Sequence, residues 1–284
     1  MPVIKEWVLG ASRQLSDAGI QSSRLDAEII LAHSLRKPRT YVHAHDDELL
    51  DARTHEIANA RLLLRLDRVP LAYIIGHKEF YGRDFMLSSD TLIPRPESEE
   101  IIDLLKVLDR TTELNTIIDV GTGSGCLLIT AGLEISNLHL IGLDISPEAL
   151  KVARRNAKIY KVKTNFLESD LLLSAPKMPK SRPYLVLANL PYVPISTIVD
   201  QEVLKEPHSA VFSGSDGMDC LRKFWLQVAE LKNKPMAIIS ESLLAQHKFN
   251  TILASQSGFQ HIETRGLAQL FKPSTKTGLE RASH

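Results

Sequence analysis

The sequence predicts an α/β protein with a mainly parallel sheet, preceded by a small helical domain and a β-hairpin linker. From residue 97 onward, short aliphatic and β-branched runs alternate with longer segments of helical periodicity, as in a chain of strand–helix–strand units. Residues 1–69 show only helical patterns. Residues 70–96 combine aromatic and β-branched residues with glycine turns and prolines, which is typical of a hairpin. We therefore expect three parts, 1–69, 70–96 and 97–284.

The composition is that of a folded protein without a dominant charge. Of the 284 residues, 44% are hydrophobic, which allows a sizeable core and excludes wholesale disorder. Lys and Arg together number 34, as do Asp and Glu, so the formal net charge is zero. Because proteins that bind nucleic acid usually carry a basic excess, we expect no stable nucleic-acid binding.

Several features predict a cytoplasmic protein without a membrane segment. Residues 1–19 carry scattered charges and lack the apolar core of a signal peptide. The longest uncharged run, 183–199, contains Pro191 and Pro194 in its interior and several polar groups, so it is not a spanning helix. Cys126 and Cys220 are far apart and outside any C-x-x-C pair, which indicates reduced thiols.

Three helices are expected in the N-terminal part. Helical periodicity covers three segments, 4–15, 26–35 and 46–66. Ser22 and Ser23 supply an N-cap for the second helix, and acids precede arginines in the third, as the helix dipole favours. His43 and His45, followed by two aspartates, are compatible with a metal site, but a solvated loop at a helix start is the expected role, and no metal is predicted.

The C-terminal part supplies the predicted sheet. Helices are expected at 98–108, 126–134, 147–160 and 218–231, and strands at 115–120, 138–144, 163–169, 184–189 and 236–241. In open parallel sheets, ligands bind beyond the C-terminal ends of the strands. The residues that end each strand are therefore the candidates for a site.

A glycine-rich turn, DVGTGSG, ends the first strand and opens a helix. Alternate glycines allow a tight turn and bring backbone N–H groups close to a ligand. The spacing G-x-G-x-G differs from the G-x-G-x-x-G of dinucleotide binders, and the pattern favours a nucleotide-like cofactor over a purely structural turn. The candidate cofactor residues here are Asp119, Gly121, Thr122, Gly123, Ser124 and Gly125.

The next two strands end in acids. Asp144 is placed to accept hydrogen bonds from both hydroxyls of a ribose; its alternative role is to cap the helix that opens with Ser146 and Pro147. Asp170 and Leu171 suit an adenine ring, because a carboxylate accepts from the amino group and an apolar side chain packs on the ring face. Taken singly, Asp170 fits an ordinary surface acid equally well.

The fourth strand ends in Asn189, Leu190, Pro191 and Tyr192. Asn189 presents a carbonyl acceptor, and Pro191 forces Leu190 toward extended geometry, which can turn the Leu190 carbonyl toward a ligand. Two adjacent acceptors would hold an NH₂ group, and Tyr192 could stack on the flat group that carries it.

These strand ends resemble the class I S-adenosylmethionine methyltransferases that modify planar nitrogen. Longer phrases resemble the protein-glutamine N5-methyltransferases of class I peptide chain release factors, the PrmC/HemK family. They are LDAEIILAHSL (25–35), PLAYIIGHKEFYG (70–82), LIPRPESEE (92–100) and EPHSAVFSGSDGMD (206–219). The resemblance spans roughly residues 20–260 and implies a Rossmann-like methyltransferase sheet.

The resemblance implies roles for individual residues. S-adenosylmethionine, which is converted to S-adenosylhomocysteine, is expected on Gly121 to Gly125 and Asp144, with Leu171 at adenine and Asn189 nearby. The substrate glutamine is expected on Asn189, Leu190, Pro191 and Tyr192, of which Asn189, Pro191 and Tyr192 are the catalytic candidates. The helical N-terminal domain is implied to help dock the release factor.

Two departures from the family pattern are visible. Leu190 replaces the first proline of Asn-Pro-Pro-Tyr, although a carbonyl at 190 is retained. The same N-L-P-Y occurs in rRNA adenine dimethyltransferases, so an adenine N6-methyltransferase acting on nucleic acid remains the alternative. At the C-terminus, Gly278 and Arg281 resemble a remnant of the closing motif, and we expect a weakened last strand. A non-catalytic binding module and a dehydrogenase are less favoured.

Overall fold

The computed structural model describes residues 1–109, 114–177 and 183–274. The chain divides into two compact units: Met1–His77 with Val199–Lys205, and Lys78–Ile198 with Glu206–His284. The first unit therefore extends past the expected boundary at residue 69 and includes a segment from far along the chain. Among the described residues, no helix is long and apolar enough to cross a membrane.

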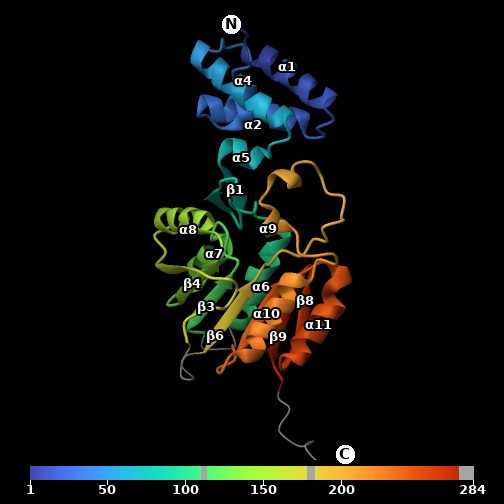
Figure 1. The fold of residues 1–284 in the computed structure, drawn as a ribbon. Coiled ribbons are helices and arrows are strands. Elements are labelled where there is room, and N and C mark those ends of the chain that lie inside the picture. The colour runs from blue at the N-terminus through green and yellow to red at the C-terminus, as the bar shows by residue number, and fades with distance from the viewer. Residues whose placement is uncertain (110–113, 178–182, 275–284) are drawn as a thin grey trace, which may run out of the picture. The chain divides into compact units, whose positions relative to one another are not determined.

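The first unit is helical (Figure 1). Its helices are α1 Ile4–Asp17, α2 Ser23–Leu35, α3 Arg39–Ala44, α4 Ala52–Leu66 and α5 Leu71–Ile75, with a short 3₁₀ turn at Val203–Lys205. They enclose a core of apolar side chains that includes Trp7, Leu15, Ile30 and Leu31.

Three expectations for this unit need correction. The predicted helix at 46–66 begins only at Ala52, because Asp51 caps it by accepting a hydrogen bond from the Thr54 N–H at 3.0 Å. Ser22 precedes α2, but its side chain makes no capping hydrogen bond. His43 is not in a loop at a helix start: it lies within α3, where its Nε2 is 3.3 Å from the buried carboxylate of Glu28.

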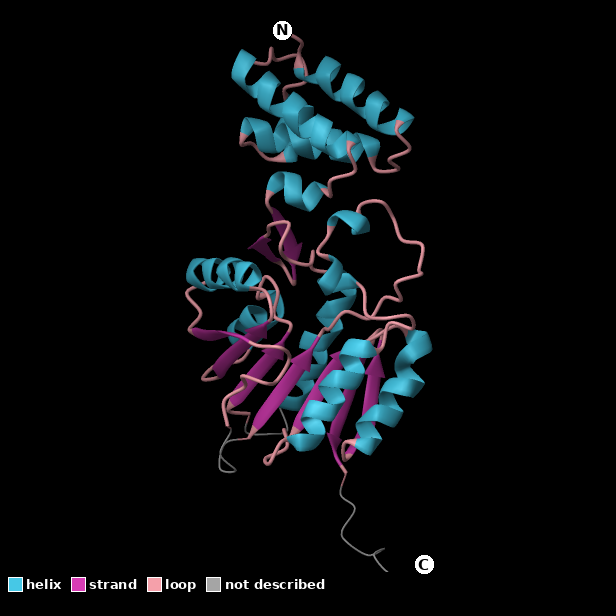
Figure 2. Cartoon of the chain, in the orientation of Figure 1, coloured by secondary structure: helices cyan, strands magenta, loops and turns pink. Residues whose placement is uncertain are grey.

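Among the described residues, seven strands form one sheet in the second unit (Figure 2). The strands are β3 Thr116–Val120, β4 His139–Asp144, β5 Thr164–Glu168, β6 Tyr184–Ala188, β7 Ala237–Glu241, β8 Phe259–Arg265 and β9 Ala268–Pro273, in the order β5-β4-β3-β6-β7-β9-β8. The first five strands in this order are parallel, as predicted, and each expected strand appears within one or two residues of its place.

Helices cover both faces of this sheet. The helices of this unit are α6 Glu99–Asp109, α7 Cys126–Glu134, α8 Pro147–Ile159, α9 His208–Val211, α10 Asp219–Glu230 and α11 His247–Gln256, with 3₁₀ turns at Pro96–Ser98 and Leu244–Gln246. Because side chains alternate along a strand, Ile117 and Leu185 pack with α6, α7 and α8, whereas Ile118 and Val186 pack with α10 and α11. Both faces of the central strands are thus buried, as their continuous apolar sequences require.

The hairpin predicted between residues 70 and 96 is present. Strands β1 His77–Phe80 and β2 Arg83–Met86 form a two-stranded sheet. The residues before it, 71–75, form helix α5 instead of extended chain.

The expectation of a weakened last strand is wrong. Strand β9 pairs antiparallel with both β7 and β8, so the sheet is complete at this side. Packing holds it in place: the ring of Phe271 lies 5.2 Å from that of Trp225, and Phe259 lies 5.8 Å from the same ring. Gly278 and Arg281 lie outside the described residues.

A buried ion pair supports the helical unit. Arg65 Nε donates to Asp26 Oδ2 at 2.7 Å, and its Nη1 donates to Glu202 Oε1 at 2.9 Å. Asp26 and Arg65 are both buried. Arg65 therefore joins α2 and α4 to the segment 199–205, which is distant in sequence.

We expect Arg65→Ala to destabilise the helical unit by about 3–5 kcal/mol, because the Asp26 carboxylate would stay buried without its partner. Trp7 lies in the core of this unit, so its fluorescence during urea denaturation, in a Trp225→Phe background, reports the change. Lys5→Ala is the control: Lys5 pairs with Asp46 at 3.9 Å with both side chains more than half exposed, so a much smaller loss is expected. Equal losses in the two variants would contradict the role of Arg65.

Candidate methyl-transfer site

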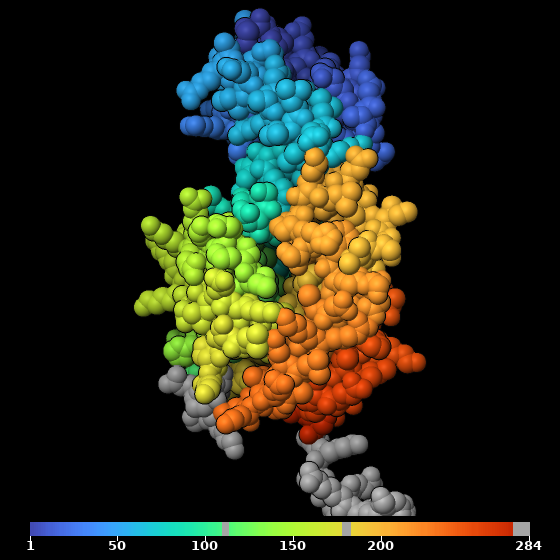
Figure 3. All heavy atoms as spheres, viewed as in Figure 1, coloured from blue at the N-terminus to red at the C-terminus, as the bar shows by residue number. Residues whose placement is uncertain are grey.

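The parallel strands bring their polar ends together around one pocket of the second unit. This pocket, of about 450 Å³, is lined by six of the predicted cofactor residues: Gly121, Gly123, Asp144, Asp170, Leu171 and Asn189. Its volume is within the range of sites for small molecules, roughly 300–1,000 Å³. Figure 3 shows the surface of this unit hollowed between its green and its orange residues. Leu190 and Pro191 also line it.

The glycine turn is held in place by the neighbouring strand. The backbone N–H groups of Gly121 and Thr122 both donate to the Leu143 carbonyl, at 2.8 and 2.9 Å. Gly121 and Gly123 have φ of 72° and 54°, which favours glycine at both positions. The turn therefore exposes backbone, and not side chains, to the pocket.

Gly125 and Ser124 have supporting places in this turn. A Cβ on Gly125 would lie 3.2 Å from the Cβ of Ala153, so the glycine permits the close approach of α7 to α8. The Ser124 carbonyl accepts from Asn156 Nδ2 at 2.8 Å. Thr122 and Ser124 border a second, smaller cavity of about 40 Å³ beside Asn189, whereas Gly125 lines neither cavity.

Asp119 lies beneath the turn and not on the pocket wall. It is 1% exposed, and its Oδ2 accepts from Thr122 Oγ1 at 2.6 Å. Its Oδ1 is buried without a hydrogen-bond partner among the described residues. Burial raises the pKa of Asp119 to about 7. The hydrogen bond from Thr122 lowers this pKa, and the negative charge of Asp144 raises it further.

Asp144 connects the turn to the start of α8. Its Oδ2 accepts from the Gly123 N–H at 2.8 Å, and its Oδ1 accepts from the Ser146 N–H at 2.9 Å. The side-chain cap of α8 is Ser146, which accepts from the Ala149 N–H at 3.2 Å. Because each carboxylate oxygen has a further lone pair, Asp144 can still accept from a bound hydroxyl. Burial raises its pKa.

The third strand end has an unexpected partner. Asp170 forms an ion pair with Lys223 of α10, and both residues line the pocket. Leu171 has φ of 56°, a strained conformation for a residue with a branched side chain. Ser169 Oγ donates to the Leu171 carbonyl at 2.8 Å and holds this turn, which leaves Leu171 on the pocket wall.

Asn189 follows the last residue of β6 and is oriented by a serine. Its Nδ2 donates to Ser98 Oγ at 2.8 Å. Ser98 belongs to LIPRPESEE and is 3% exposed. With the NH₂ group directed at Ser98, the carbonyl of the Asn189 side chain is the end available to a ligand.

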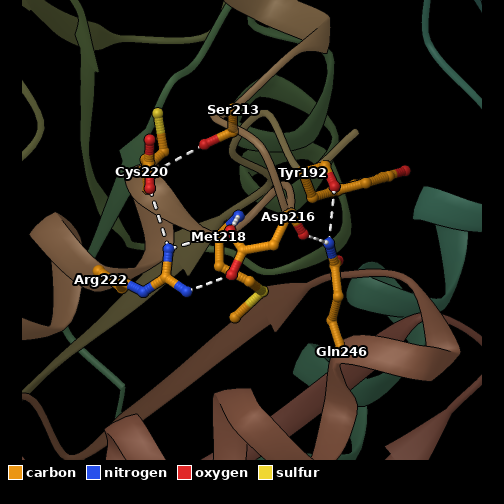
Figure 4. Close-up of polar contacts among 8 residues, drawn as sticks. Tyr192, Ser213, Asp216, Met218, Cys220, Arg222 and Gln246 are labelled. Carbon is orange, nitrogen blue, oxygen red and sulfur yellow. Dashed lines mark hydrogen bonds and ion pairs between the residues drawn. The ribbon is translucent and has the colours of Figure 1, made fainter. Parts of the chain in front are cut away.

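Tyr192 is held at both its ends but lines neither cavity. Its hydroxyl donates to Glu241 Oε1 at 2.8 Å, and its carbonyl accepts from Gln246 Nε2 at 2.8 Å. Figure 4 shows Gln246 between the carbonyls of Tyr192 and Asp216. A Cβ on Gly217 would be 2.1 Å from the Tyr192 carbonyl oxygen, so only glycine allows this approach.

Glu206, the first residue of EPHSAVFSGSDGMD, contacts the segment LIPRPESEE. It is buried, forms an ion pair with Arg95, and accepts from the Ile93 N–H at 3.0 Å. The phrases LIPRPESEE and EPHSAVFSGSDGMD thus contact each other and support the strand ends. Individual roles for Ser98, Glu206, Glu241 and Gln246 were not predicted. Ser98 and Glu206 lie inside the phrases and the other two lie outside them, and the partners of all four are far away in sequence.

The sheet order, the glycine turn and the acid after the second strand define a class I S-adenosylmethionine-dependent methyltransferase. A solved structure supports the fold: the hMettl16 catalytic domain in complex with MAT2A 3′UTR hairpin 1 is 14% identical, with a TM-score of 0.52 covering 86% of this chain and 90% of that one. At this identity the likeness concerns the fold alone. S-adenosylmethionine is the methyl donor, and the volume and donor set of the pocket fit it.

Sequence relatives identify the family. The model described as PrmC N-terminal domain matches residues 6–76, and that described as ribosomal protein L11 methyltransferase (PrmA) matches 101–215. A release factor glutamine methyltransferase of Koribacter versatilis (strain Ellin345) is 36% identical over 80% of this chain and 81% of its own. One of Buchnera aphidicola subsp. Baizongia pistaciae (strain Bp) is 33% identical over 77% and 78%. The chain belongs to the release factor glutamine methyltransferase family.

We expect Asp144→Ala to lower the affinity for S-adenosylmethionine at least tenfold, because charge-assisted hydrogen bonds contribute about 1.5–3 kcal/mol each. Isothermal titration calorimetry measures the change. Glu148→Ala, which removes an exposed acid from the first turn of helix α8, should bind the cofactor as the wild type does. Unchanged affinity in Asp144→Ala would remove this residue from the cofactor site.

The raised pKa of Asp119 predicts a dependence of stability on pH. The folded chain keeps this proton up to about pH 7, whereas the unfolded chain releases it near the ordinary value of 3.8. The contribution of Asp119 to stability therefore falls as the pH rises through this window. Relative to the wild type, the free energy of unfolding of Asp119→Asn should rise by up to about 4 kcal/mol as the pH is raised from about 4 to about 8. Denaturation followed by Trp225 fluorescence in a Trp7→Phe background tests this; a difference that does not change with pH would contradict it.

Proposed function

We propose that this protein transfers a methyl group from S-adenosylmethionine to the side-chain N5 of the glutamine in the Gly-Gly-Gln motif of class I peptide chain release factors. The observation that supports it most is the hydrogen bond from the Asn189 NH₂ group to Ser98, which leaves the side-chain carbonyl of this pocket residue as the end available to a ligand. A carbonyl in this place suits a substrate that presents N–H bonds. The relatives named above are release factor glutamine methyltransferases.

The chemistry requires orientation more than activation. A carboxamide nitrogen is a poor nucleophile because its lone pair is delocalised into the carbonyl. S-adenosylmethionine supplies an electrophilic methyl group when bound. In the proposed complex, the Asn189 and Leu190 carbonyls accept one N–H bond each and aim the nitrogen at the methyl group. Such alignment can contribute about 7–11 kcal/mol.

The same acceptors also stabilise the transition state. Positive charge grows on the nitrogen as the new bond forms, and fixed carbonyl dipoles lower its energy. Pro191 fixes the backbone that follows Leu190. Tyr192, half-buried and held at its hydroxyl and its carbonyl, gives a rigid flat surface for the amide. No general base is needed before transfer, since an N-protonated amide readily loses its proton to water.

The helical unit is proposed to serve substrate docking in the cytoplasm. It matches the PrmC N-terminal domain and carries none of the strand-end residues that build the pocket. A role in recognising the body of the release factor would let the second unit read only the exposed glutamine.

Mass spectrometry tests the proposed reaction. A purified release factor is incubated with the protein and the cofactor, and the Gly-Gly-Gln peptide is examined; one added methyl group on that glutamine is expected. A factor with Gln→Asn in the motif is the matched control and should remain unmodified. Methyl transfer to RNA or DNA, with the release factor left unmethylated, would favour the adenine N6-methyltransferase alternative. Binding of the cofactor without any methyl transfer would favour a non-catalytic binding module.

We expect Asn189→Ala to lower kcat on the release factor by about 10²–10³, since deletion of comparable transition-state contacts costs roughly 2.7–4 kcal/mol. Cofactor affinity should change less, because most of the pocket wall remains. Single-turnover rates and calorimetry separate the two effects. Wild-type kcat in Asn189→Ala would contradict the assignment.

Leu190→Pro is the opposite test of the same stretch. It restores the commoner family motif and keeps the carbonyl at 190, so the rate of the folded variant should stay within about tenfold of wild type. Leu190 is buried and its Cδ2 would lie 3.2 Å from a Cβ on Gly121, so some loss of stability is expected. Loss of all turnover in a folded variant, with Asn189→Ala tolerated, would make the stretch a structural turn.

A further inference from the structure

We propose that Ser98 and Glu241 are positioning residues that fix which end of the Asn189 amide faces the substrate. The inference rests on the proposed function in one respect: a substrate NH₂ group needs the carbonyl end of Asn189. Neither residue lines the larger pocket, so both act through Asn189 and Tyr192.

The sheet brings these residues together. Strand β6 pairs in parallel with β7, with Ala188 opposite Ser240. Asn189 and Glu241 are the next residues on the two strands, so both lie at the same edge of the sheet. Ser98, from the 3₁₀ turn before α6, contacts Asn189 there.

Glu241 is a carboxylate with an unusual setting. It is fully buried, and its Oε1 accepts from the Tyr192 hydroxyl at 2.8 Å. Burial raises its pKa, whereas the Ser98 and Tyr192 hydroxyls lower it as hydrogen-bond donors; Glu97 raises it further and Arg95 opposes that effect. Glu241 Oε2 has no hydrogen-bond partner among the described residues. Ser98, whose hydroxyl acts on the pKa of this carboxyl and whose Oγ accepts from Asn189, is the donor that we assign to it.

A proton count gives the direction of the relay. A serine hydroxyl has one hydrogen and two acceptor lone pairs. When that hydrogen is directed at the Glu241 carboxylate, Ser98 Oγ can only accept from Asn189. Asn189 must then present its NH₂ group to Ser98 and its carbonyl to the pocket. If the Ser98 hydroxyl hydrogen could instead rotate toward Asn189, it could donate to the carbonyl of a flipped Asn189 amide, and the two orientations would be equally well bonded.

A flipped amide would oppose the reaction. Its NH₂ group would face the NH₂ group of the substrate, so that two donors meet and neither N–H bond of the substrate finds an acceptor. The buried carboxyl group of Glu241, as an acceptor for the Ser98 hydroxyl, therefore selects the productive orientation. The same carboxyl group accepts from the Tyr192 hydroxyl, which brings Tyr192 into the network proposed for Asn189.

Three variants test the relay by steady-state kinetics on the release factor. Ser98→Ala and the isosteric Glu241→Gln should each lower kcat at least tenfold, with the affinity for S-adenosylmethionine within about twofold of wild type, because neither touches the cofactor. Ser98→Thr keeps the hydroxyl and should recover most of the rate; Ser98 borders the cavity of about 40 Å³, which leaves room for the added methyl group.

Ser257→Ala is the matched control for the loss of a buried serine. Its hydroxyl donates to backbone carbonyls of Trp225 and Leu253 at 2.9 and 3.0 Å, outside both cavities. This variant should lose stability but keep the wild-type kcat. Wild-type kcat in Ser98→Ala and Glu241→Gln would overturn the inference, as would equal losses in Ser98→Ala and Ser98→Thr when both are folded.

A second measurement needs no substrate. In ¹⁵N-labelled protein, the side-chain NH₂ signal of Asn189, identified by its loss in Asn189→Asp, should exchange slowly with water and become faster in Ser98→Ala. Unchanged exchange would overturn the relay. If this result holds while the wild type fails to methylate any release factor, the proposed function fails and the orientation of Asn189 stands.

Discussion

The parallel register of β6 between β3 and β7 is the constraint on which the site depends. Val120 lies opposite Ala188, and Ala188 lies opposite Ser240, so the glycine turn, Asn189 and Glu241 all begin at the same level of the sheet. A shift of one residue in β6 would reverse its buried faces. It would also turn Asn189 away from Ser98. The core packing that fixes the register therefore also fixes the chemistry.

Much of the fold followed from the sequence because its signals are local. Continuous apolar strands such as YLVLAN and helices such as PEALKVARRNAKIY carry their own periodicity, and strand-end polar residues are found by reading one position further. The last strand was expected to be weak and β8 was not predicted, because both pack on Trp225, which lies in α10. Helix α4 begins at Ala52, later than the periodicity predicted, because the N-cap at Asp51 sets its first residue.

The supporting residues of the site could not be found in this way. Ser98 meets Asn189 across 91 positions, and Tyr192 meets Glu241 across 49, so no local pattern joins them. Asp119 and Glu241 also keep one carboxylate oxygen without a partner among the described residues. Buried polar groups of this kind cost stability, and such costs gather where a protein orients groups for binding or catalysis.

The placement of Val199–Lys205 in the helical unit has an evolutionary consequence. The chain passes from one unit to the other after residues 77, 198 and 205, so the helical unit is not a contiguous module. Recombination that exchanged only residues 1–77 would separate Arg65 from the Glu202 it binds. A helical unit from another protein would carry basic side chains that pair with a different segment in place of 199–205. Divergence of the two regions is therefore expected to proceed by paired substitutions, with changes in α4 matched by changes around residue 202.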